Sequence, residues 1–379
     1  MYKIVGAAAL LLATILISPS TSASAGSARR VSTTFFIPAG NLPGTDPVAS
    51  DTALVYGVTN PLNHKSNADH PYTGYHVRVY ARKLALDAGR LVASPARLLF
   101  VAPRGLNVAG YSVAANRFVY VVYNGSQLGF WQLRARNLTT GRNTLIDSNG
   151  LEHLPSLFGG ARSDGSMVTW VAWTRNEGSA TSVLRTYDFA TGKSAVIARG
   201  GSENTWAYAT PDISGQWVVF ARQEFATRKS QIFGYNVRTR VTRKLSRPSQ
   251  VASEPGISGN LVGWKVGWQW QGSHGLEVYR LNTRLRTYIR APGEEGVAAA
   301  GGRYLVFTSN APNAGDTDAD LYDAVSGTTR VLAGPPVSAN SASSYDLAAG
   351  DTISIGGGGP VPTCAPHACP IRFTIVQLS

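Results

Sequence analysis

The sequence is poor in charge, in methionine and in cysteine. Only 15% of its 379 residues are charged, against roughly a quarter in an ordinary soluble domain. So few charges argue against helical arrays held by ion pairs, and the glycines show no three-residue period, which excludes collagen. Hydrophobic residues make up 44% of the chain, too many for an intrinsically disordered protein. The chain can bury a large core, and its 40 Gly and 9% aromatic residues favour β-structure.

Long apolar runs are also scarce, and the one present stands at the N-terminus. Lys3 precedes a mostly apolar stretch from Ile4 to Ile17, and the triplet Ala23-Ser24-Ala25 follows. This order is typical of a secretory signal peptide with its cleavage site. No later segment reaches the roughly eighteen apolar residues of a membrane-spanning helix. We therefore expect residues 1–25 to be removed and the protein to be exported, to the periplasm or the extracellular space, without a transmembrane anchor.

The two cysteines, Cys364 and Cys369, are separated by four residues near the C-terminus. In an exported protein such a pair predicts a local disulfide that pins a short loop. A zinc site is the alternative, but it needs two further ligands, and nearby His367 supplies only one.

Acidic residues are outnumbered. There are 22 Asp and Glu against 35 Lys and Arg, which gives a net charge of +13. Such a charge attracts anionic partners such as wall polymers, lipid headgroups, acidic polysaccharides or nucleic acid. The cations are spread singly along the chain without a dense run, so we expect them mainly to solvate the surface. We expect no specific recognition of nucleic acid.

A repeated unit organises most of the chain. Each unit has a polar turn, a hydrophobic strand, a loop of variable length, an alternating strand, a T-G or T-R turn and a short final strand. The second turn is marked by Gly141, Gly192, Arg240, Arg284 and Gly327. The hydrophobic strands are LVYGVT from Leu54, FVYVVY from Phe118, VTWVAW from Val168, WVVFAR from Trp217, LVGWKV from Leu261, YLVFTS from Tyr304 and TISIGG from Thr352.

These repeats predict an all-β fold, a single β-propeller with seven blades of about four antiparallel strands, although six or eight blades remain open. Residues 48–379 form the propeller and residues 26–47 an N-terminal segment. The last repeat lacks a segment for its outermost strand, and VSTTFFIP, from Val31 to Pro38, has no partner of its own. We expect this segment to pair with the C-terminal strands and close the ring. We also expect a monomer.

Two stretches carry a family resemblance. They are WAYATPDISGQWVVFARQEFATRKSQIFGYNVRTRVTRKLS and SDGSMVTWVAWTRNEGSATSVLRTYDFATGKSAVI. The turn Thr210-Pro211-Asp212, the strand from Trp217 to Phe220, the string Ser230 to Phe233 and the closing Leu245 resemble TolB-like propeller repeats. The resemblance extends from Val48 to about Leu332. It implies a scaffold whose relatives are mainly interaction platforms and include lyases and peptidase lids, so function must be argued from the sites.

Candidate binding residues fall in loops that open on one face of a propeller, the default ligand surface. The segment GWQWQGSHG alternates indoles and amides, as a sugar-binding surface does; packing of the indoles within the blade is the alternative. The longest insertion, from Asn60 to Tyr75, contributes two histidines. The ligand-binding candidates are His64, His70, Trp268, Gln269, Trp270, Gln271 and His274.

Two patterns bear on metals. Asp316, Asp318 and Asp320 alternate in an expected loop and offer calcium ligands, but Leu321 and Gly327 stand where an EF-hand has Gly and Glu. A solvated acidic loop is the alternative to a calcium site. Four histidines, His64, His70, His153 and His274, could converge over the propeller mouth, since some propeller lyases of pectic fragments hold a metal with histidines there.

No nucleophile elbow, zinc-protease motif, P-loop or complete dinucleotide fingerprint is present in the sequence. We therefore predict a non-catalytic exported propeller that acts as a protein- or glycan-binding scaffold, with no resident cofactor beyond the calcium considered above. The alternative is a metal-assisted polysaccharide lyase or glycosidase with its site at the mouth. A wall-associated protein held by its basic charge is a third interpretation.

Overall fold

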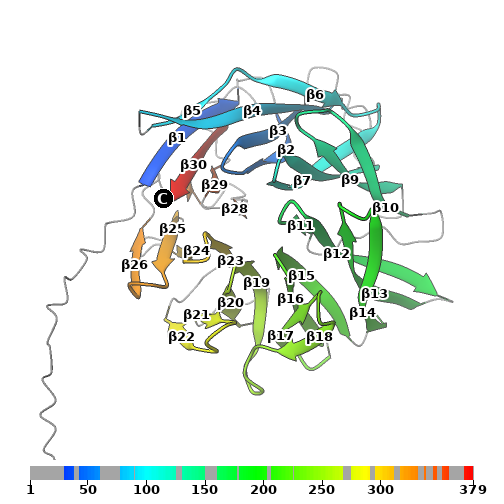
Figure 1. Cartoon of the computed structure of the whole chain (residues 1–379), viewed down its shortest axis with the longest axis vertical. Coiled ribbons are helices and arrows are strands. Elements are labelled where there is room, and N and C mark those ends of the chain that lie inside the picture. The colour runs from blue at the N-terminus through cyan, green and yellow to red at the C-terminus, as the bar shows by residue number, and fades with distance from the viewer. Residues whose placement is uncertain are drawn as a thin grey trace, which may run out of the picture.

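Strands make up all the regular structure of the residues that the computed structural model describes. These are residues 30–37, 42–59, 77–88, 90–124, 130–149, 160–176, 179–202, 206–224, 226–267, 275–290, 295–310, 316–331, 337–338, 345–347, 352–357 and 371–378. The strands form seven antiparallel sheets of four or five strands. The sheets stand around a common centre as the blades of a propeller (Figure 1). The predicted all-β propeller is confirmed. No helix in the described ranges is long and apolar enough to span a membrane.

Each blade is ordered from the centre of the ring outward, and blades are numbered here along the chain (Figure 1). The first, innermost strands are β2 (Leu42–Ala49), β7 (Leu106–Ala114), β11 (Ala161–Ser163), β15 (Trp206–Ser214), β19 (Ala252–Ser258), β23 (Glu295–Ala300) and β28 (Tyr345–Leu347). The second strands are β3 (Ala53–Thr59), β8 (Arg117–Asn124), β12 (Met167–Asn176), β16 (Trp217–Glu224), β20 (Leu261–Val266), β24 (Tyr304–Asn310) and β29 (Thr352–Gly357). All seven coincide with the hydrophobic strands expected from the repeats.

The outer half of each blade is more exposed. The third strands are β4 (Val77–Asp87), β9 (Trp131–Asn137), β13 (Ser179–Asp188), β17 (Lys229–Asn236), β21 (Gly275–Arg280), β25 (Asp316–Asp323) and β30 (Ile371–Leu378). The outermost strands are β5 (Arg90–Ala93) with β6 (Arg97–Val101), β10 (Asn143–Ser148), β14 (Lys193–Ser202), β18 (Val241–Lys244), β22 (Arg286–Ile289), β26 (Thr328–Val331) with β27 (Val337–Ser338), and β1 (Arg30–Ile37). The first blade begins at Leu42, before the expected boundary at residue 48.

The second strands are hydrophobic throughout because each contributes to two cores. In β8, Phe118, Tyr120 and Val122 pack against blade 1, whereas Val119 and Val121 pack against blade 3. Successive side chains of a strand point to opposite faces, and here both faces meet a neighbouring blade. A blade therefore has no solvent side near its second strand, which explains why alternation is absent there and present farther out.

The ends of the chain close the ring. β1 pairs antiparallel with β30, from Arg30 opposite Leu378 to Ile37 opposite Ile371. Blade 7 thus takes its outermost strand from the N-terminus and its other three from the C-terminus. The predicted closure is confirmed, and it leaves β30 with a partner on each side.

Hydrogen bonds from one blade to the next tie the turns between first and second strands. The amide of Gly215 donates to Asp164 Oδ2, and the amide of Gly259 donates to Ser214 Oγ, each at 2.9 Å. The amide of Gly302 donates to Ser258 Oγ at the same distance. The polar residues of these repeated turns therefore join consecutive blades 3 to 6.

Four arginines also act between blades. Each guanidinium donates to a backbone carbonyl of an adjacent blade: Arg97 to Leu138, Arg117 to Gly165, Arg162 to Tyr111 and Arg280 to Ala324. A guanidinium is well suited to this because it stays charged and carries several rigid donors. The expectation that the dispersed cations serve mainly to solvate the surface is wrong for these four.

The turns between third and fourth strands share one geometry in five blades. The amide of the marker residue donates to the carbonyl four residues earlier, and the marker takes a left-handed conformation. The markers, with their φ values, are Gly141 (73°), Gly192 (68°), Arg240 (58°), Arg284 (59°) and Gly327 (72°). Glycine adopts this conformation freely, whereas an L side chain is strained by contact with the backbone.

The connections differ sharply between the two faces of the ring. On one face, called the turn face, first strands join second strands and third strands join fourth strands through two to five residues. On the opposite loop face the connections range from two residues, 177–178, to the seventeen of 60–76. Long connections also span 149–160 and 358–370 there. The ring is therefore uniform on one face and variable on the other.

Deleting residues 31–38 should lower the melting temperature by roughly 5 °C or more, because the deletion removes a full-length ladder and exposes the edge of β30. Circular dichroism during heating measures the change. Removing only residues 1–29, which precede β1, should leave the melting temperature unchanged. Equal melting of both truncations would contradict the closure.

Replacing Arg284 by Gly should raise the free energy of unfolding by about 0.5–1 kcal/mol, because the left-handed turn position favours Gly. Arg284 is exposed and its side chain has no contact to lose in the described structure. The mirror variant, Gly327→Ala, should lower it by about 1 kcal/mol through backbone strain alone, since no heavy atom lies within 4 Å of an added Cβ. Urea titration measures both, and two shifts of the same sign would contradict the turn assignment.

Candidate functional site

The predicted ligand residues belong to the loop face. Trp268, Gln269, Trp270, Gln271 and His274 follow the end of β20 in blade 5. In blade 1, His64 and His70 stand between β3 and β4, and in blade 7 Cys364 and Cys369 stand between β29 and β30. His153 stands between β10 and β11. All of these residues lie outside the described ranges, so their grouping and the disulfide stay predictions, as does the signal peptide.

The three aspartates stand in a strand rather than in the expected loop. β25 spans Asp316–Asp323, with Asp318 opposite Ser309 and Asp320 opposite Phe307 of β24. Alternate positions of a strand lie about 6.6 Å apart on one face, whereas a calcium loop curls around its ion. The described residues contain no group of three side chains suited to a metal. Calcium binding by Asp316, Asp318 and Asp320 stays a prediction.

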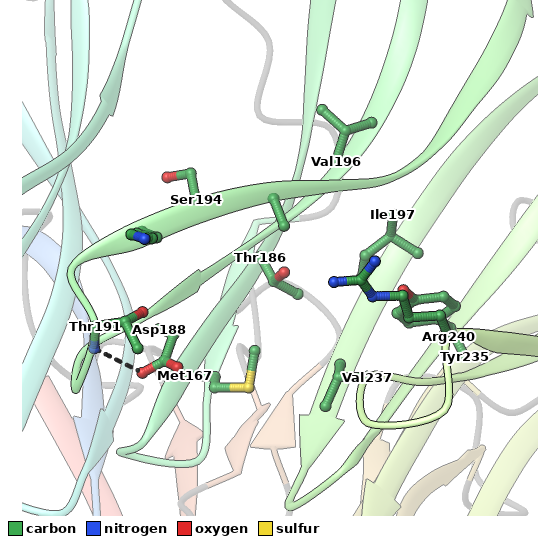
Figure 2. Close-up of a pocket in the computed structure, with 12 residues that line it drawn as sticks. Met167, Thr186, Asp188, Thr191, Ser194, Val196, Ile197, Tyr235, Val237 and Arg240 are labelled. Carbon is green, nitrogen blue, oxygen red and sulfur yellow. Dashed lines mark hydrogen bonds between the residues drawn. The ribbon is translucent and has the colours of Figure 1, made fainter.

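A cavity of about 420 Å³ opens between blades 3 and 4, toward the turn face. We call it the inter-blade pocket (Figure 2). Its volume is within the range of small-ligand sites. It combines an apolar wall with hydroxyls and three charged groups, and it is lined by Met167, Thr186, Asp188, Thr191, Lys193, Ser194, Ala195, Val196, Ile197, Tyr235, Val237 and Arg240.

The pocket exists because two short or flexible side chains occupy positions that larger groups fill elsewhere. Asp188 ends the third strand of blade 3 opposite Met167, as Arg280 ends that of blade 5 opposite Leu261. Arg280 reaches across to blade 6, but Asp188 turns back and accepts the amide of Ala190 at 2.7 Å. It also accepts the amide of Thr191 (Figure 2). The gap beside blade 4 is therefore left open.

The pocket is cationic at its rim. Lys193 and Arg240 are exposed, and neither forms an ion pair with any described residue. In Figure 2 the Arg240 guanidinium points from blade 4 across the pocket toward Thr186. The one carboxylate, Asp188, is already solvated by its own turn. This arrangement suits a ligand with an anionic group, several hydroxyls and one apolar face.

Other buried charges are fully engaged in the fold. The Glu277 side chain is 1% exposed, and its carboxylate contacts Arg247 at 3.4 Å and Arg286 at 3.0 Å. Gln250 donates to the same carboxylate. Between blades 2 and 3, the indole of Trp170 donates to Asp147 at 2.9 Å. These groups hold blades together and offer no free reactive atom.

Asp212 is a buried carboxylate near the centre of the ring. Burial raises the pKa of its carboxyl, and the amides of Ile257 and Ile213 and the charge of Arg162 oppose the rise. A raised pKa of this kind can mark a catalytic acid. Here, however, Oδ2 accepts the Ile257 amide of the next blade at 2.7 Å, and Oδ1 accepts the Ile213 amide at 2.8 Å. We interpret Asp212 as an inter-blade link.

The raised pKa of Asp212 fixes the sign of a pH effect. Between its ordinary value of 3.8 and the raised value, the folded protein holds a proton that the unfolded chain has lost, so stability falls as pH rises. The stability of the wild type relative to Asp212→Asn should therefore decrease between about pH 4 and pH 7. Urea titration at each pH measures the difference.

Asp323 is the matched control for Asp212. A hydrogen bond from Arg303 lowers the pKa of Asp323 to about 2, so its contribution to stability is lost only as pH falls below its ordinary value. The wild type should differ from Asp323→Asn by a constant amount between about pH 4 and pH 7. The same slope for both variants would show that Asp212 is not the titrating group.

No protein-family model and no curated protein matches this sequence. Among solved structures, an oligogalacturonate lyase in complex with manganese is similar, with a TM-score of 0.53 at 12% identity over 92% of this chain and 98% of that chain. A prolyl endopeptidase gives a TM-score of 0.57 at 11% identity over 92% of this chain and 50% of its own.

The β-propeller domain of the Trilobed protease from Pyrococcus furiosus is also similar. It gives a TM-score of 0.50 at 13% identity over 85% of this chain and 90% of that domain. At such identities the likeness concerns the fold alone. Membership of the TolB-like family stays a prediction. The strand pairings and these neighbours together show that the chain folds as an all-β propeller.

Proposed function

We propose that the chain is an exported, non-catalytic propeller that binds a protein or glycan partner through its loop face. The observation that carries this proposal is the contrast between the two faces. The turn face uses connections of two to five residues in every blade, whereas the loop face carries connections of up to seventeen residues. A rigid ring that presents long segments on one side is the usual architecture of a binding platform.

The proposed contact surface centres on blades 1 and 5. Trp268 and Trp270 follow β20, and their indole faces, with the amides of Gln269 and Gln271, match the stacking and hydrogen bonding that sugars require. His64 and His70 of the longest connection add polar groups at the same face. Export and monomeric assembly belong to the same proposal.

A metal-assisted polysaccharide lyase or glycosidase is the second candidate. The four histidines His64, His70, His153 and His274 all belong to connections on the loop face. One structural neighbour is an oligogalacturonate lyase in complex with manganese. Histidine is a common ligand of such metals, and a metal over the propeller mouth would supply a Lewis acid.

A glycan array with the mature chain tests the leading proposal. The wild type should bind a defined set of glycans, and Trp268→Ala with Trp270→Ala should lower the affinity at least tenfold through loss of stacking. Leu285→Ala, which removes a side chain exposed on the turn face, is the matched control and should bind normally. Equal binding by all three would contradict a sugar-binding loop face.

The same preparations separate the enzyme from the scaffold. Incubation with polygalacturonate and manganese, followed by ultraviolet absorbance of unsaturated products, should show no cleavage. Manganese-dependent cleavage that is lost in His70→Ala would replace the scaffold by the lyase.

A further inference from the structure

Cations that are free of structural duties gather on the outer edges of blades 4 and 5. Residues 225–253 contain seven Lys and Arg and no acidic residue, and residues 278–293 contain four Arg and no acidic residue. This concentration is invisible in the chain as a whole, where the cations are spread singly. It becomes a surface because β18 and β22 are the outermost strands of neighbouring blades (Figure 1).

Subtracting the engaged arginines sharpens this surface. Arg247 and Arg286 pair with Glu277, and Arg280 donates to Ala324. The exposed residues that remain form no ion pair among the described residues. We call them the basic rim: Arg238, Arg240, Arg243 and Lys244 of blade 4 with Arg284 and Arg290 of blade 5.

The inter-blade pocket lies at one end of the basic rim. Arg240 belongs to both, and β18 begins at the next residue. A carboxylate between Arg240 and Lys193 would have two cations without competing partners. Hydroxyls of Thr186, Ser194 and Tyr235 lie in the same lining. A carboxylated sugar has this combination of one charge and several hydroxyls, together with an apolar ring face.

The shape of the rim selects among polyanions. Neighbouring blades of a seven-bladed ring are rotated by about one seventh of a turn, so the two edges face different directions. A flat bilayer or a straight duplex can touch one edge at a time, whereas a flexible chain can follow both. Binders of single-stranded nucleic acid stack bases on aromatic rings, but the exposed strand β18 consists of Val, Thr, Arg and Lys.

We propose that the basic rim binds a flexible acidic polysaccharide and that the inter-blade pocket holds one of its carboxylated units. This surface is separate from the loop face, so the proposal does not depend on the proposed function. It gives the excess positive charge of the chain a location and a partner.

Binding to immobilised alginate at fixed salt, measured by biolayer interferometry, tests the rim. The variant Arg238→Gln, Arg240→Gln, Lys244→Gln should bind at least tenfold more weakly than the wild type. The control Lys83→Gln, Arg90→Gln, Arg104→Gln removes the same charge from exposed positions of blade 1 and should change the affinity no more than about twofold. Equal loss in both variants, or no binding by the wild type, would overturn the proposal.

Further arms test the pocket, the partner class and the independence from the loop face. Ala195→Trp, at an exposed position of the pocket lining, should weaken alginate binding with an unchanged melting temperature; undiminished binding would remove the pocket from the site. Polyuridylate or anionic vesicles that bind the rim more tightly than alginate would overturn the choice of partner. Trp268→Ala with Trp270→Ala should bind alginate normally, and loss of binding there would place the site on the loop face instead.

Discussion

Backbone pairing between the two ends of the chain is the constraint on which the ring depends. β1 and β30 meet along their whole length, from Arg30 opposite Leu378 to Ile37 opposite Ile371. Every second strand needs a blade on each side to bury both of its faces, so an open ring would expose two sheet faces at once. Closure therefore conditions the packing of all seven sheets, including those far from the termini.

Within the closed ring, blade-to-blade contacts rely on a few directed polar groups. The carboxylates Asp164 and Asp212 accept backbone amides of the next blade, and Arg97, Arg117 and Arg280 donate to backbone carbonyls across the same boundaries. Such bonds satisfy main-chain groups at the blade boundaries that no strand ladder reaches. The low charge content of the chain is consistent with this economy, because few ionic groups are needed and many are used within the fold.

The fold could be predicted from the sequence because burial on both faces of the second strands leaves a continuous apolar signature, as in Phe118 to Tyr123. The inter-blade contacts could not, because the partners of Arg117 and Arg280 are backbone carbonyls, which carry no sequence signal. The pocket escaped for a related reason. It depends on Asp188 and Met167 being shorter or more flexible than their counterparts in other blades, which matters only once the register is known. For the aspartates of β25, a loop was expected where the chain continues as a strand.

The two faces of the ring carry different freedoms, and this bears on how its function can vary. Turns such as Ser214-Gly215 and Ser258-Gly259 are fixed by their bonds to the neighbouring blade, so a change there disturbs the ring. The loop-face connections and the exposed side chains of β18 and β22 contribute little to blade packing and can change without that penalty. A net charge of +13 is therefore a property of the outer edges more than of the core. Once the arginines held by carbonyls and by Glu277 are set aside, the free cations are unevenly distributed, and blades 4 and 5 hold a stretch from which acidic residues are missing.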